Sequence, residues 1–120
     1  MFGQVDQARF LKCIAEPTRM QILGLLVKSQ EKCVGEIVDI LGKEQSLISH
    51  HLAKLKECNI VVARQDNQRV YYAVADPRIS QLVIDVYSLV TDMPLCKPGV
   101  PNCKKGGSNV TPKHEINIAI

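Results

Sequence analysis

The stretch QSLISHHLAKLKECNIVVARQDNQRVYYAV, residues 45–74, decides the fold. In its first part, about residues 45–57, the apolar residues Ile48, Leu52 and Leu55 recur at helical spacing, which predicts an amphipathic helix. The opposite face carries the small or polar residues Ser46, Ser49, His50 and Ala53. A face so poor in carboxylates suits the major groove of DNA, although an ordinary solvent-exposed helix would also fit it.

The second part of the stretch predicts a β-hairpin. Two runs rich in β-branched and aromatic residues, 60–64 and 69–74, flank the turn residues 65–68. Arg64 and Arg69 stand on either side of the expected tip, where a guanidinium can contact a phosphate beside the groove. A helix followed by a basic-tipped hairpin is the order of a winged helix-turn-helix.

Three further helices are predicted before this stretch. Apolar spacing predicts the first over residues 5–15, and Pro17 suits the first position of a second, largely apolar helix. Residues 28–32 read as a connection. The segment CVGEIVDILG, residues 33–42, predicts a third helix with Cys33 at the capping position and Gly42 as its C-terminal stop.

A last helix is expected from Asp76-Pro77 to about residue 90, and it carries more apolar surface than one small domain can cover. We therefore expect a homodimer formed through the first and last helices. The predicted fold is mainly α with a β-hairpin wing (α+β). Residues 1–93 form the DNA-binding and dimerisation domain, and residues 94–120 form a cysteine-containing loop and a flexible tail.

Composition sets limits on the compartment. The chain has 120 residues, of which 46% are hydrophobic and 22% charged, with a net charge of +3. The N-terminus lacks the basic start and apolar run of a signal peptide, and no segment is long enough to span a membrane, so a cytoplasmic location is expected. An odd count of five cysteines without an export signal favours reduced thiols over a disulfide framework.

The motifs EPTRMQILGLL, CVGEIVDILG and the stretch quoted above occur in an order that resembles the ArsR/SmtB family of dimeric winged-helix repressors. The resemblance implies a repressor that binds double-stranded operator DNA and releases it when a metal or metalloid binds. It further implies this set of DNA-contacting residues: Gln45, Ser46, Ser49, His50, Lys54, Arg64 and Arg69. Glu44 stands where relatives often have a capping Ser or Thr, which predicts modest affinity.

The effector site is predicted in LCKPGVPNC, residues 95–103, where Cys96 and Cys103 flank a Pro-Gly turn. Some arsenic-responsive members of the family carry cysteines at this place, so the resemblance implies As(III) or Sb(III) as effector, and soft thiolates suit such ions. A third ligand is not evident, and Cys33 or Cys13 is the candidate. Alternatives are Cd(II), Pb(II) or Zn(II), or a thiol-oxidant or persulfide signal.

Other sites known in the family match less well. Only the first cysteine of the C-V-C pattern is present, at Cys33, and the last helix has no histidine to complete a zinc site. Cys58 matches one position of the cadmium and lead sites, but Lys54 stands where the second thiol would be, so Cys58 is better explained as a small buried residue at the helix end. The C-x5-R spacing of Cys13 to Arg19 resembles an oxyanion-binding phosphatase loop, but Pro17 has no N–H to donate. The chain is therefore not expected to be an enzyme.

Overall fold

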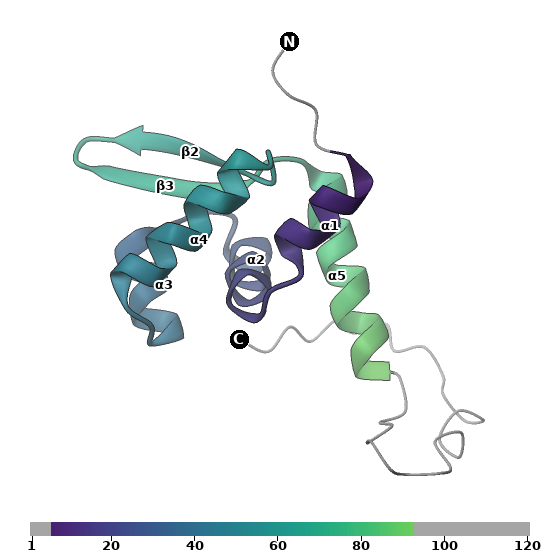
Figure 1. Ribbon diagram of the computed structural model, residues 1–120. Coiled ribbons are helices and arrows are strands. Elements are labelled where there is room, and N and C mark those ends of the chain that lie inside the picture. Colours follow the sequence, from purple (N-terminus) through teal and green to yellow (C-terminus); the bar gives the residue numbers. More distant parts are fainter. Residues whose placement is uncertain (1–5, 93–120) are drawn as a thin grey trace.

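The computed structural model describes residues 6–92, which form five helices and a three-stranded antiparallel sheet (Figure 1). In chain order the elements are α1 (Gln7–Ile14), α2 (Pro17–Ser29), β1 (Lys32–Cys33), α3 (Val34–Leu41), α4 (Gln45–Glu57), β2 (Val61–Asp66), β3 (Arg69–Val74) and α5 (Pro77–Asp92). The helix-turn-helix pair α3–α4 followed by a hairpin confirms the predicted winged-helix fold. No helix in this part of the chain has the length and apolar character that a membrane crossing requires.

The helix ends follow from local chemistry. Pro17 occupies the first turn of α2, and the Glu16 carboxylate accepts from the Arg19 N–H at 2.9 Å. At the start of α3 the Glu36 carboxylate accepts from the Cys33 N–H at 3.0 Å. Gly42 ends α3 in the left-handed region at φ 67°, which glycine adopts without a Cβ clash. The predicted positions of Pro17 at the start of α2, and of Cys33 and Gly42 at the two ends of α3, are confirmed.

The sheet corrects two expectations. The hairpin strands stay paired as far as Asp66 opposite Arg69, so the turn has two residues rather than four, with Asn67 at φ 59°. Polar residues 65 and 66 resemble a turn in composition, yet they continue the ladder on the solvent side. The predicted connection at 28–32 is also wrong, because α2 continues to Ser29 and Lys32–Cys33 pair with Tyr72 and Tyr71 of β3.

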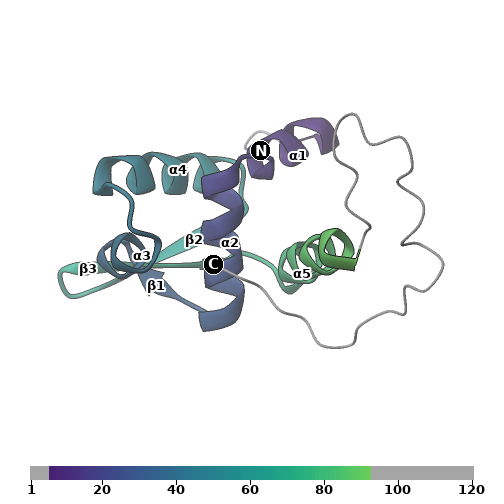
Figure 2. The same ribbon diagram turned by 90° about the horizontal axis from the view of Figure 1, so that it is seen from below.

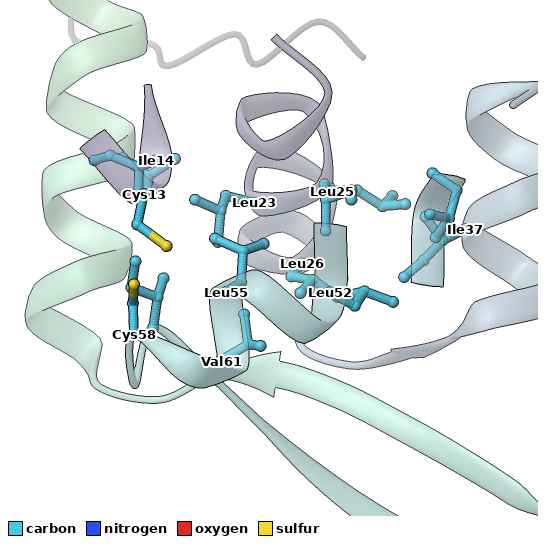
Figure 3. Close-up of a cluster of buried hydrophobic side chains, with 14 residues drawn as sticks. Cys13, Ile14, Leu23, Leu25, Leu26, Ile37, Leu52, Leu55, Cys58 and Val61 are labelled. Atoms are coloured by element: carbon cyan, nitrogen blue, oxygen red, sulfur yellow. The ribbon is translucent and has the colours of Figure 1, made fainter. Parts of the chain in front are cut away.

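The core gathers around α2, which lies between the α3–α4 pair and α5 (Figure 2). Fully buried aliphatic side chains from α2, α3, α4, the start of β2 and α5 fill it (Figure 3): Ile22, Leu23, Leu26, Ile37, Ile48, Leu52, Leu55, Ile60, Val61 and Val83. The Tyr87 hydroxyl donates to the Met20 carbonyl at 2.8 Å and fastens α5 to α2. Helix α4 thus rests on a close-packed support, which fixes the side chains on its outer face.

Candidate nucleic-acid interface

The outer face of α4 is open to solvent along its length. The residues predicted to contact DNA from this helix are all exposed: Gln45, Ser46, Ser49, His50 and Lys54. On the opposite side Ile48, Leu52 and Leu55 are completely buried. The structure therefore brings the predicted groove-reading side chains together on one exposed surface. Glu44 precedes the helix without a side-chain capping hydrogen bond, as its poor suitability as a cap predicted.

A buried polar network holds α4 against the corner between α1 and α2. Arg19 donates from Nε to Nδ1 of His51 at 3.0 Å and from Nη1 to the Cys13 carbonyl at 2.9 Å. The Glu16 carboxylate lies 3.7 Å from Nε2 of the same imidazole. Burial lowers the pKa of His51 below its usual value in spite of this carboxylate, so the ring accepts from Arg19 in its neutral form.

This network was missed by sequence reasoning. At about 100° per residue, His51 falls beside the stripe formed by Ile48, Leu52 and Leu55, so helical spacing carried a signal that it points inward. The identity of its partner, Arg19, depends on how α2 packs against α4. The same network places the Arg19 guanidinium against the Cys13 carbonyl.

The wing presents two exposed arginines that differ in their position and contacts. Arg69 adjoins the turn, opposite Asp66. Arg64 lies farther down β2, where its guanidinium donates to one carboxylate oxygen of Glu31 at 2.9 and 3.2 Å and stands 5.1 Å from the centre of the Tyr71 ring. Both arginines belong to the predicted DNA surface. A phosphate that approaches Arg64 competes with the Glu31 carboxylate.

The predicted effector cysteines, Cys96 and Cys103, lie outside the described residues. Cys13, Cys33 and Cys58 are free thiols and all are buried. Between residues 6 and 92, no three His, Cys, Asp or Glu side chains gather closely enough to hold a metal ion. The three described thiols thus do not form a metal site by themselves.

Cys33 stands apart from the other two thiols. It precedes α3 at the base of the wing and lines an open hollow of about 470 Å³ together with Glu36, Asp39 and Arg69. Its position at the start of the helix was predicted.

Cys13 and Cys58 lie next to each other at one edge of the core (Figure 3). Cys13 projects from the last turn of α1, and its Sγ donates to the Lys54 carbonyl at 3.3 Å. Burial, together with a hydrogen bond to the Cys58 side chain, raises the pKa of the Cys13 thiol to about 11. Cys58 caps the end of α4 and is buried, as predicted. The pairing of the two thiols was not predicted, since they are far apart in sequence.

Comparison with known proteins places these features in context. Residues 16–62 match the family profile described as "Bacterial regulatory protein, arsR family". The chain is 36% identical over 85 residues to the probable mercury resistance operon repressor of Streptomyces lividans, covering 71% of this chain and 67% of that protein. It is 33% identical over 79 residues to a cadmium resistance transcriptional regulatory protein CadC homolog of Staphylococcus aureus, covering 66% and 65% respectively.

Solved structures agree with these sequence matches. The crystal structure of Rv0081 from M. tuberculosis superposes with a TM-score of 0.65 at 34% identity, covering 71% of this chain and 85% of that one. HlyU from Vibrio cholerae N16961 gives a TM-score of 0.63 at 32% identity, covering 68% and 87%. Both the sequence and the backbone arrangement are therefore shared with these proteins.

Proposed function

The chain belongs to the ArsR/SmtB family of DNA-binding transcriptional regulators, and from this premise we propose that it is a repressor that releases its operator when a thiol-binding metalloid is present. The observation that carries the DNA-binding part is the outer face of α4, which is exposed, small and nearly free of carboxylates. Four of its residues would read the major groove: Gln45, Ser46, Ser49 and His50. Lys54, with Arg64 and Arg69 of the wing, would contact phosphates.

A homodimer is part of this proposal. Large apolar side chains of α1 and α5 are exposed in the single subunit: Leu11 by 54%, Leu89 by 62% and Val90 by 59%. Exposed apolar residues on these two helices support dimerisation through them. Two-fold symmetry would then present two copies of α4 to successive major grooves, about 34 Å apart along the DNA.

The proposed effector is As(III) or Sb(III), bound through thiolates of Cys96 and Cys103, with Cys33 or Cys13 as a candidate third ligand. Thiophilic ions fit a cysteine-based site, and the names of two relatives refer to mercury and cadmium resistance. Cd(II), Pb(II) or Zn(II), or a thiol oxidant or persulfide, are the alternative effectors. Cys96 follows the end of α5 at Asp92 by four residues, so binding there would act on a helix of the proposed dimer surface.

The proposed mechanism is a change in spacing. An effector bound beside α5 alters how two subunits meet, and the distance between the two α4 helices no longer fits one turn of DNA. Allosteric couplings of this kind are typically about 1–3 kcal/mol, which corresponds to a loss of operator affinity of about 5- to 150-fold.

Fluorescence anisotropy of a labelled operator fragment tests this proposal. Reduced wild-type protein and the Cys96→Ser and Cys33→Ser variants are each titrated with arsenite while bound to DNA. Release by about one equivalent per subunit in the wild type, lost in Cys96→Ser, is the expected result, and Cys33→Ser tests whether Cys33 is the third ligand. Failure of arsenite to release DNA from the wild type would overturn the metalloid effector, and the same assay with Cd(II), Pb(II), Zn(II) and a persulfide would identify the alternative.

A further inference from the structure

The Cys13–Cys58 pair is a chemical group that the DNA-binding function does not use. The two side chains are 6% and 7% exposed, and they join different elements, the end of α1 and the end of α4. Cys13 also donates to the Lys54 carbonyl in the last turn of α4. Two reduced thiols in contact across a helix–helix boundary are a preformed dithiol.

We propose that Cys13 and Cys58 form an internal chelating site for a neutral trivalent hydroxide, arsenous acid or its antimony counterpart. Trivalent arsenic carries a lone pair and is pyramidal, so its two sulfur ligands lie on the same side of the arsenic atom, close enough together for neighbouring thiols to supply both. A linear two-coordinate ion such as Hg(II) needs its two sulfurs on opposite sides, which a pair of touching thiols does not offer. The geometry therefore favours the trivalent metalloid.

The chemistry of the step also suits a buried site. Arsenous acid, As(OH)3, condenses with two thiols: two S–H and two As–O bonds break, two As–S bonds form, and two water molecules leave. Arsenic remains trivalent, one hydroxide stays on it as the third ligand, and no net charge appears. A divalent cation would instead require both thiols to lose protons as it entered an apolar environment.

An open hollow at the surface lies beside residues that adjoin the two cysteines. An open hollow of about 440 Å³ lies among α1, the turn after α4 and the start of α5, and its lining includes Phe10, Asn59 and Ile79. Asn59 directly follows Cys58 and has a φ of 63°, while Phe10 lies one helical turn before Cys13. The hollow thus borders residues adjacent to both cysteines, and the last step to the buried sulfurs requires local opening of the packing.

Occupancy of this site would change how α1 sits on α4. The core around the pair is closely packed, so an added arsenic atom and its hydroxide must displace one helix from the other. Leu11, in the turn of α1 that precedes Cys13, belongs to the proposed dimer surface. Neither Cys96 nor Cys103 takes part in this site, and in this respect the inference goes beyond the proposed function.

The test uses the full chain with Cys33, Cys96 and Cys103 all replaced by serine, so that Cys13 and Cys58 are the remaining thiols. The protein is kept reduced with a phosphine, because dithiol reductants would themselves bind arsenite. Titration with arsenite is followed by the ultraviolet absorption of As–S bonds. We expect one equivalent bound per subunit, and loss of the signal when Cys13→Ser is added.

Serine at position 13 keeps a donor for the Lys54 carbonyl, so the added substitution should fold, and circular dichroism with thermal unfolding verifies this. Cys58→Ala is the second variant and should likewise abolish binding. A folded triple variant that binds no arsenite, or binding that survives Cys13→Ser, overturns the inference. Neither result depends on DNA, so failure here is distinct from failure of the operator-release assay with Cys96→Ser.

Discussion

Replacement of Arg64 by alanine tests how the wing contacts DNA. Arg64 is an exposed cation of β2, and we expect each wing of a dimer to place it on one phosphate. The variant would then lose two phosphate contacts per dimer, and each contact contributes about 0.9 to the slope of log affinity against log salt. The slope should therefore decrease by about 1.8. Between about 0.1 and 0.3 M salt, the wild type should lose about sevenfold more affinity than the variant.

The assay is the anisotropy of a labelled operator fragment at several salt concentrations. Arg78→Ala is the matched control, because Arg78 carries the same charge, is exposed and has its own carboxylate partner, Asp76, at 2.9 Å. It lies at the start of α5, which follows the base of the hairpin and not its tip (Figure 1). Its replacement should leave the slope at the wild-type value.

An unchanged slope in Arg64→Ala would refute the reasoning and restrict Arg64 to holding the base of the wing. Glu31→Gln examines the competition between carboxylate and phosphate directly. Since an exposed ion pair is weak, removing the negative charge of Glu31 should raise operator affinity by no more than severalfold. A decrease in affinity would mean that Glu31 orients Arg64 for DNA rather than withholding it.

Three other predictions concern stability and assembly. Gly42→Ala should lower the free energy of unfolding by about 1–2 kcal/mol, because φ is 67° at this position. Gly35→Ala should raise the free energy of unfolding by about 0.5–1 kcal/mol, because this helical position has open space around it. Chemical denaturation would measure both changes. The pKa of His51 is lowered in the folded state, so as the pH falls the imidazole takes up a proton more readily in the unfolded chain. Stability should therefore fall as pH drops below about 6.5. His51→Gln should flatten that pH dependence in urea titrations. Leu89→Glu should convert the dimer to monomers in light scattering, and Ile40→Glu, on a side chain of α3 that is also exposed, should not.

Much of the fold could be predicted because its signals are local. Helix α4 occupies the predicted residues 45–57, since a regular apolar stripe and a nearby β-rich run mark both of its ends. Pro17 and Gly42 mark their helix boundaries because the backbone preferences of proline and glycine can be read directly from the sequence. The strand β1 could not be found in this way, because two residues contain no periodicity and their pairing depends on where β3 lies.

In the candidate site, too, the features set by local sequence could be predicted and those set by packing between helices could not. Exposure of Ser49 and His50 followed from helical spacing alone. The Arg19–His51 hydrogen bond and the Cys13–Cys58 contact arise where separate helices meet, so only the packed structure reveals them. Cys13 was a candidate ligand on chemical grounds, yet its neighbour in space is the thiol that sequence reasoning assigned to simple packing.

The short strand β1 has a mechanical consequence. By pairing with β3 immediately before α3 begins, it joins the wing to the helix pair that it accompanies, and each subunit then carries its wing and α4 as a single lever. The angle between the wing and α4 is then constant when the subunit changes its orientation on the DNA. The groove contacts of α4 and the phosphate contacts of the wing should therefore be kept or lost together.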